Sequence, residues 1–295
     1  MIKSSEQSKD QYPLYCLSFS PNWNTYQILS TNSNGLLVYG TNAEAFIIDM
    51  QNKNFISSVK PPEEASYNQI KVTSVLLEED TLFVGYLNGI ICAFNHQKEN
   101  QLLFKTQVSK SPIMHIIKRT NSQGTARLLL VDSEGAFFEL VYLQETAKVF
   151  SLSINCFSQV VKCHEFFSAS LQKSLLLTIS AKGIITIWDL EAKKEIFNYN
   201  TTNAIFKADF IFDDEFTITC GLITKKDFLV IVRIDLKTIK EESKQFQAYP
   251  VKLHFQLQSK DKNDSEVLAS KPDIMFLSKD RVREFSHLFL LTHYF

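Results

Sequence analysis

A short structural unit recurs along this chain at a nearly constant interval. Each copy holds an apolar run, a turn, and a second apolar run that ends at an equivalent position. Those end positions are 46, 46, 48 and 46 residues apart, at Asp49, Asn95, Val141, Asp189 and Asp235. The turns keep the same interval, at Ala43, Gly89, Gly135 and Gly183. A fixed period in the forties, with four short apolar runs per unit, predicts a β-propeller of four-stranded blades.

The clearest copy of the unit spans Ser174 to Leu190, with the sequence SLLLTISAKGIITIWDL. Its two apolar runs flank a turn at Lys182-Gly183, and the second run ends on Trp188-Asp189. Short runs rich in Val, Ile and Phe favour strands, and the chain contains 24 Phe. Helical periodicity is hard to find, which argues against a fold that alternates helices and strands. The predicted fold class is therefore all-β.

The units divide the chain into a polar tail at 1–12, which we expect to be disordered, and a single propeller domain at 13–295. We expect five clear blades and a degenerate sixth, with six or seven blades in the complete ring. A strand at Tyr15–Phe19 is expected to close the ring against C-terminal strands, because closure removes exposed edges. Val251–Leu257 is expected to be a strand of the degenerate region. The blades are predicted near residues 26–60, 70–108, 112–153, 159–200, 204–249 and, for the degenerate one, 251–295.

Composition excludes several function classes. The formal net charge of −1 argues against a nucleic-acid or membrane-surface role driven by global charge, although it leaves room for a local basic patch. No run approaches the ~20 apolar residues of a membrane helix, and the N-terminus lacks the apolar core of a signal peptide. The five cysteines show no tight framework, so we expect reduced, buried thiols in a cytoplasmic or nuclear protein.

The motifs of common catalytic and metal sites are missing from the sequence. Cys156, Cys163 and His164 suggest a metal site, but a second thiol pair at zinc-finger spacing is absent. We find no Gly-rich phosphate loop, no helical histidine pair and no nucleophile elbow. The six histidines fall in different units, so a catalytic triad would have to be assembled in space. We predict a protein that is not an enzyme and takes no metal, cofactor or small-molecule substrate.

The segment Gly183 to Leu190, GIITIWDL, resembles the Trp-Asp phrase of WD40-repeat β-propellers, and about five units of the chain follow the same plan. We expect a structural role for Trp188 and Asp189, in which the indole packs between blades while the carboxylate braces nearby backbone. Asp49 and Asp235 match the acid alone, whereas Asn95 is a weaker match and Val141 departs. The family's Gly-His dipeptide occurs nowhere, so packing must carry more of the blade stability.

A second resemblance lies at the N-terminus. The phrase Ser20-Pro21-Asn22-Trp23 is similar to the opening of Gemin5-type proteins, which are WD40 proteins of the SMN complex that bind spliceosomal small nuclear RNA and its cap. This resemblance implies an RNA-binding propeller in which Trp23 stacks on a base. The same phrase is also a common strand-to-turn phrase of WD40 repeats generally, and the tandem propeller of that family needs more than twice this length.

Antiparallel strand order places the turns between second and third strands on the same face as the connections between blades. That face is predicted to gather the candidate binding residues Tyr86, Lys182, Lys225 and Lys226. Its mixture of charge and aromatic character is typical of a protein-contact rim more than of a nucleic-acid groove. The opposite face carries acidic turns that would repel phosphate. We therefore predict a non-catalytic scaffold that binds other proteins in a multi-subunit assembly, with RNA recognition as the alternative.

Overall fold

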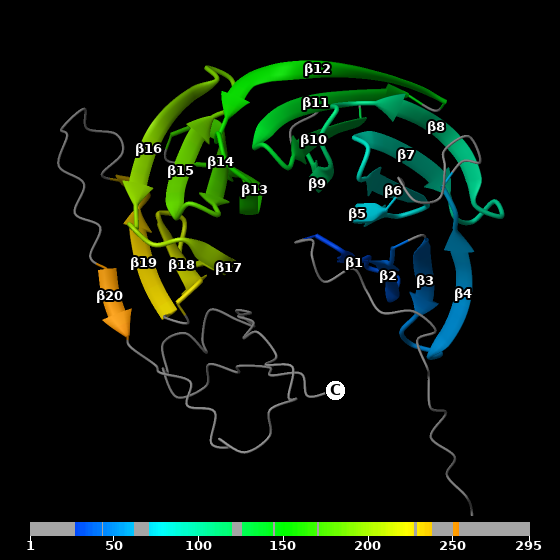
Figure 1. Cartoon of the computed structure of the whole chain (residues 1–295), viewed down its shortest axis with the longest axis horizontal. Coiled ribbons are helices and arrows are strands. Elements are labelled where there is room, and N and C mark those ends of the chain that lie inside the picture. Colours follow the sequence, from blue (N-terminus) through cyan, green and yellow to red (C-terminus); the bar gives the residue numbers. More distant parts are fainter. Residues whose placement is uncertain are drawn as a thin grey trace, which may run out of the picture.

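A computed structural model of the chain describes residues 27–42, 44–61, 71–119, 126–143, 145–169, 171–226 and 229–237, together with the backbone of 250–253. These residues form five four-stranded antiparallel sheets and no α-helix. The sheets follow one another along the chain and stand like blades around a common centre (Figure 1). The prediction of an all-β fold with five four-stranded blades is confirmed.

Within each blade the strands are paired in chain order, and the first strand lies nearest the centre (Figure 1). The first two blades are β1 (Leu29–Thr31), β2 (Leu36–Gly40), β3 (Ala45–Asp49), β4 (Asn54–Val59), β5 (Val72–Glu78), β6 (Thr81–Tyr86), β7 (Ile90–Asn95) and β8 (Gln101–Gln107). The third and fourth are β9 (Ile113–Lys118), β10 (Ala126–Asp132), β11 (Ala136–Leu143), β12 (Thr146–Asn155), β13 (Val160–Ser168), β14 (Lys173–Ser180), β15 (Ile184–Asp189) and β16 (Lys194–Asn200). The fifth is β17 (Ile205–Phe212), β18 (Thr217–Thr224), β19 (Leu229–Asp235) and β20 (Pro250–Leu253).

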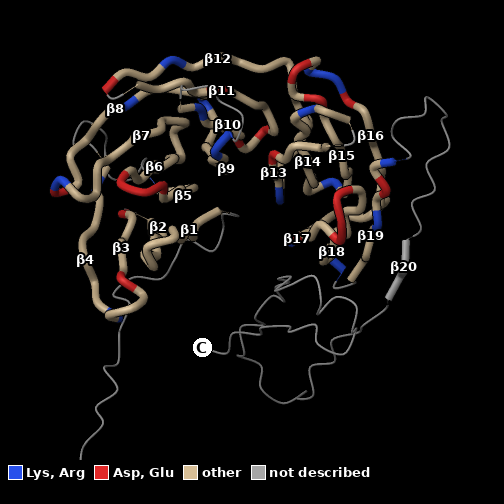
Figure 2. Tube along the Cα trace, turned by 180° about the vertical axis from the view of Figure 1, so that it is seen from behind, with Lys and Arg blue, Asp and Glu red and all other residues tan. Residues whose placement is uncertain are grey.

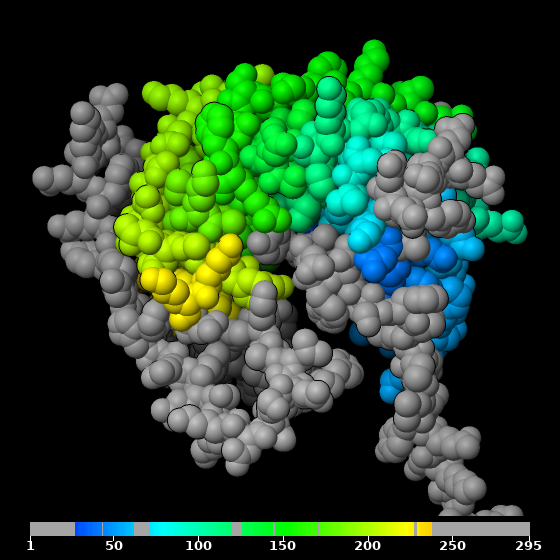
Figure 3. Space-filling view, viewed as in Figure 1, coloured from blue at the N-terminus to red at the C-terminus, as the bar shows by residue number. Residues whose placement is uncertain are grey.

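The apolar core lies between neighbouring blades. Second strands are covered on both faces, so all eight residues of β18 are buried, including its threonines. Outer strands are much more exposed: β8 and β16 each have a single buried residue, Phe104 and Phe197. Charged residues collect mainly at the turns between strands (Figure 2). In the space-filling view the third and fourth blades, in green, form one continuous body (Figure 3).

The repeating glycines have a common physical cause. Gly89, Gly135 and Gly183 adopt φ values of +77°, +85° and +85°, a left-handed region that favours glycine. A Cβ atom on any of them would lie 2.0–2.3 Å from a carbonyl oxygen in the connection to the next blade. Each glycine carbonyl in turn accepts a hydrogen bond from the first residue of that connection, as Gly183 does from the Thr201 amide at 2.9 Å. The regular spacing of these glycines therefore reflects a backbone contact that the second, third and fourth blades share.

The acidic position that closes each unit holds a hairpin turn. The Oδ1 atoms of Asp49 and Asp189 each accept two backbone N–H bonds from the following turn, at 2.8–3.0 Å. Asn95 makes the same pair of bonds at 3.1 Å, and Asp235 accepts one from Lys237 at 2.9 Å. Val141 cannot do so and lies inside β11, which continues to Leu143 before the chain turns. The third blade thus replaces a side-chain-capped turn with a longer hairpin.

One predicted boundary is wrong. The fifth blade was expected to end at residue 249, with Val251–Leu257 as a strand of the degenerate region. Instead β20 pairs with β19, with Leu229 opposite Leu253, and completes the fifth blade. Which segment completes the blade depends on its hydrogen-bonding register with β19. The turn residues in the sequence do not determine that register. The tail at 1–12, the closing strand at Tyr15–Phe19 and the rest of the degenerate blade lie outside the described residues.

Candidate functional site

One face of the blades combines turns and connections, and we call it the link face. It contains the turns between second and third strands together with the connections between blades. Backbone hydrogen bonds join the two, from the Ala181 amide to the Gln159 carbonyl and from the Lys225 amide to the Ala204 carbonyl, each at 2.8 Å. The arrangement follows the antiparallel order expected from the sequence. It fixes the link-face side chains on a rigid backbone frame.

The most exposed large apolar side chain of the described residues is Phe157, on the connection from β12 to β13. Its side chain is 79% exposed, and its backbone has a φ of +49°. A bulky residue in this region is uncommon and strained. Two contacts hold it there: the Phe157 amide donates to Asn155 Oδ1 at 2.6 Å, and Lys182 Nζ donates to the Phe157 carbonyl at 3.1 Å. The sequence pattern did not single out Phe157, although a Phe between Cys and Ser in a predicted connection is a usable signal.

Basic side chains share the link face with Phe157. Lys182, Lys225 and Lys226 are exposed at turn positions, as is Lys110 on the connection from β8 to β9. The nearby acid Glu134 accepts a hydrogen bond from the Ser111 hydroxyl at 2.8 Å. Acidic turns lie on the other face, beside β6 and β18, where they appear as red segments in Figure 2. The link face thus offers an aromatic residue with lysines around the same rim.

Tyr86 does not belong to this rim, so the prediction that it is a binding residue of the link face is wrong. Its side chain is only 1% exposed and packs in the core between the first two blades. Burial raises the pKa of its hydroxyl well above the usual range. Successive strand residues point to opposite sides, so the inward direction of Tyr86 leaves the next residue, Leu87, 38% exposed. Trp23, the other aromatic candidate, lies outside the described residues.

Trp188 and Asp189 occupy the boundary between the third and fourth blades. The Trp188 indole packs against the apolar cluster of that boundary and donates from Nε1 to Thr178 Oγ1 at 3.2 Å. Asp189 is 1% exposed and pairs with Lys173 Nζ at 2.5 Å. Burial alone would raise the pKa of its carboxyl, but the Ala192 amide and the Lys173 ammonium lower it overall. These contacts hold blades and turns in place and present no reactive group to solvent.

The candidate reactive groups are packed as core. Burial raises the pKa of the Cys92 thiol to about 12 and that of Cys156 to about 11, which removes the thiolate at neutral pH. Cys163 is buried, whereas His164, the next residue, packs on Phe210 at 5.2 Å between ring centroids. Among the described residues, no three His, Cys, Asp or Glu side chains converge to hold a metal ion. The same ranges contain no helix long and apolar enough to cross a membrane.

No family model and no curated protein sequence matches this chain. Solved structures of WD40 β-propeller proteins do match it. A chain of the mitotic checkpoint complex superposes with a TM-score of 0.58 at 14% identity, over 75% of this chain and 64% of the other. The fold is the WD40 β-propeller.

Two further propellers show the same likeness. The β-propeller domain of Cps50 (Swd1) from Myceliophteria thermophila gives a TM-score of 0.52 at 11% identity, over 77% of this chain and 71% of the domain. Sqt1 from Saccharomyces cerevisiae gives 0.52 at 12% identity, over 70% of this chain and 59% of Sqt1. The chain therefore spans less than two thirds of the first and third of these structures. At identities this low, the similarity concerns the fold alone.

Proposed function

We propose that this WD40 propeller is a non-catalytic scaffold that binds partner proteins through its link face, within a multi-subunit assembly of the cytoplasm or nucleus. The observation that carries the proposal is Phe157, a large side chain left 79% exposed on a strained backbone. Strain at such a position is retained where the surrounding structure fixes it, and it clusters at binding sites. Membership of the mitotic checkpoint complex for one similar structure is in line with a role in assemblies.

The energetics divide between the aromatic residue and the lysines. Burying a phenylalanine side chain under a partner contributes about 1.5–3 kcal/mol, which makes Phe157 the expected centre of the contact. Exposed rim charges such as Lys182 and Lys225 add less affinity but accelerate the encounter with an acidic partner. The proposed partner surface therefore has an apolar pocket surrounded by acidic residues.

Affinity purification with the full chain as bait tests this proposal. The variant Phe157→Asn keeps the fold, because Asn tolerates a positive φ, and it removes the aromatic ring. Leu143→Ser is the matched control, since Leu143 is 69% exposed but lies in the hairpin on the opposite face. We expect wild type and Leu143→Ser to recover the same partners and Phe157→Asn to lose them. Recovery of no stable partner by wild type, or equal recovery by Phe157→Asn, would contradict the proposal.

RNA recognition is the second candidate function. An RNA would bind at the link face, where the lysines lie, because the acidic turns of the opposite face would repel its phosphates. In this case Lys182, Lys225 and Lys226 would contact phosphates while Trp23 stacks on a base. Titration with capped small nuclear RNA tests it: binding should weaken steeply with salt and disappear in Trp23→Ala. Binding that is absent or insensitive to salt rules this candidate out.

A further inference from the structure

The chain contains the dipeptide Asn-Gly twice, each time in a turn. Asn34-Gly35 lies between β1 and β2, on the face opposite the link face, and Asn88-Gly89 lies between β6 and β7, on the link face. The dipeptide is chemically labile, because glycine has no side chain to hinder attack of its backbone nitrogen on the preceding side-chain amide. In both turns the glycine amide donates to the carbonyl three residues earlier, and the glycine φ is +78° or +77°. The two turns therefore differ mainly in their surroundings.

The Asn88-Gly89 turn is enclosed. Gly89 is buried and Asn88 is half-buried. The Asn88 Oδ1 atom accepts a bond from a backbone amide of its own turn at 3.3 Å, and the Asn88 carbonyl accepts one from Gln107 Nε2 at 2.8 Å. The Gly89 carbonyl accepts a further bond from the Val108 amide at 3.0 Å. Rotation of this peptide would break its contacts with the connection to the third blade.

The Asn34-Gly35 turn is open. Asn34 is exposed, and its side-chain amide makes no hydrogen bond to a described residue. The Gly35 amide makes one long bond, of 3.3 Å, to the Asn32 carbonyl. The nearest atoms to a Cβ on Gly35 would belong to the flexible Gln51 side chain, at 3.1 Å, whereas a Cβ on Gly89 would lie 2.0 Å from a carbonyl oxygen. The Asn34-Gly35 peptide can therefore rotate in contact with solvent.

We propose that Asn34 is a site of chemical modification, at which the folded protein deamidates through a cyclic imide. The Gly35 backbone nitrogen attacks Asn34 Cγ and forms a new C–N bond, while the bond from Cγ to Nδ2 breaks. The side-chain nitrogen leaves as ammonia and takes up the proton that the Gly35 nitrogen gives up. A solvent water then opens the imide at either carbonyl, which yields aspartate or isoaspartate at position 34.

Both products change this turn. Each adds a negative charge to a face that already carries acidic turns. Isoaspartate also runs the main chain through the former side chain, which adds one carbon atom between Asn34 and Gly35. That atom would displace the Gly35 carbonyl from the Met50 amide, now 2.9 Å away, and disturb the bonds that Asn32 Oδ1 accepts from the Asn34 and Leu36 amides. Because β1 has only three residues, we expect the first blade to lose stability as isoaspartate accumulates.

Ageing of the full chain in mildly alkaline buffer, followed by proteolysis and mass spectrometry, tests the proposal. Water labelled with heavy oxygen marks the new carboxyl group. We expect Asn34 to deamidate at least about tenfold faster than Asn88, because opening the enclosed turn breaks several additional hydrogen bonds. In the urea-unfolded control both sites should react at similar rates. Equal rates in the folded chain, or folding that slows Asn34 as strongly as Asn88, would overturn the proposal.

Thermal unfolding of the aged protein measures the consequence. Wild type should unfold at a lower temperature after ageing, whereas Asn34→Gln should keep its unfolding temperature, since the longer glutamine side chain forms a cyclic imide far more slowly. Asn88→Gln is the matched control and should lose stability as wild type does. Equal losses in wild type and Asn34→Gln would overturn the proposal. The turn lies away from Phe157, so these outcomes are independent of the function proposed above.

Discussion

The boundary between the third and fourth blades and the boundary between the fourth and fifth are built differently. The second is a large apolar cluster of fifteen buried residues, whereas the first has only eight. The smaller cluster is supplemented by polar links: Arg119 pairs with Glu165, and His115 Nε2 lies 2.7 Å from the Val160 carbonyl. One boundary is held mainly by burial of apolar area, and the other also by directional bonds.

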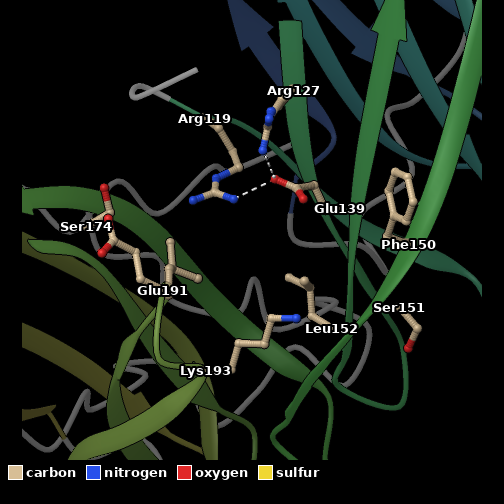
Figure 4. Close-up of a pocket in the computed structure, with 10 residues that line it drawn as sticks. Arg119, Arg127, Glu139, Phe150, Ser151, Leu152, Ser174, Glu191 and Lys193 are labelled. Carbon is tan, nitrogen blue, oxygen red and sulfur yellow. Dashed lines mark hydrogen bonds and ion pairs between the residues drawn. The ribbon is translucent and has the colours of Figure 1, made fainter. Parts of the chain in front are cut away.

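This difference indicates where a cavity can form in a protein built from repeated blades. Apolar packing fills space and leaves no opening. The polar boundary accommodates charged groups at its centre and a cavity of about 430 Å³ beside them (Figure 4), next to the blade whose hairpin departs from the repeat at Val141. We infer that the departure and the cavity belong together, because the long hairpin of β11 and β12 supplies one wall of the cavity, at Phe150 and Leu152 beside a β-bulge.

The largest expected effect comes from breaking the ionic link. Arg119→Gln should lower the free energy of unfolding by about 3–5 kcal/mol, since it leaves the buried Glu165 unpaired. The matched variant on the apolar boundary is Lys162→Gln, which removes the half-exposed Lys162–Asp209 pair at 2.9 Å. That variant should cost less than about 1 kcal/mol. Urea denaturation measures both, and equal losses would show that the boundaries do not differ in this way.

Truncation of two adjacent leucines of β14 to alanine compares the apolar packing of the two boundaries. Leu177 belongs to the apolar boundary and Leu176 to the polar one, and both are fully buried. Leu177→Ala should cost about 4 kcal/mol and Leu176→Ala about 3 kcal/mol, because the walls of the less densely apolar boundary relax more easily. Urea denaturation checks the order, and a larger loss for Leu176→Ala would reverse our interpretation.

The pH dependence of stability tests the polar boundary, because His115 forms a hydrogen bond across it. Burial, as the main cause, lowers the pKa of His115 to about 4. Above pH 6.5 neither state is protonated, but between pH 6.5 and 4 only the unfolded chain binds a proton at this residue. The stability of the folded chain therefore falls by about 1.4 kcal/mol per pH unit over this range, a total loss of about 3 kcal/mol at pH 4. His115→Gln retains a donor for the Val160 carbonyl and does not titrate.

The measurement is the difference in unfolding free energy between wild type and His115→Gln across that pH range. The difference cancels titration elsewhere, including that of Glu165, whose raised pKa has the opposite influence. A flat difference between pH 6.5 and 4 would contradict the assignment.

The smallest effects concern the capped turn that the fourth blade has and the third lacks. Asp189→Ala should cost about 1–2 kcal/mol, since two turn amides lose their acceptor. Asp189→Asn should cost less than about 1 kcal/mol, because Asn95 already makes the equivalent pair of bonds in the second blade. Val141→Thr, inside the uncapped hairpin, should change stability by less than about 0.5 kcal/mol. Thermal unfolding distinguishes the three, and equal losses would remove the contrast between the two turns.

The repeat made much of the fold predictable from sequence. Period, strand content and turn glycines such as Gly135 are local signals, and they predicted five blades of four strands. Tyr86 was misplaced because side-chain direction at the end of a strand depends on pairing register, which the sequence leaves open. The Arg119–Glu165 pair was missed, although its spacing of 46 residues is close to the repeat period, with Arg119 directly after the inner strand β9 and Glu165 on the inner strand β13 of the next blade. Opposite charges one period apart are thus a usable signal for contacts between blades.

The glycine contacts also decide where this molecule can be lengthened. At Gly89, Gly135 and Gly183 a turn and a connection touch through backbone atoms, so added residues at these points would separate adjacent blades. In the described part of the chain, the turn at residues 96–99 on the opposite face makes no backbone hydrogen bond to a connection between blades, and only the following Asn100 bonds to the first blade, at the Ser58 carbonyl. A fluorescent reporter or affinity tag grafted there should leave the blades assembled, which makes that turn a suitable attachment point for imaging or immobilisation.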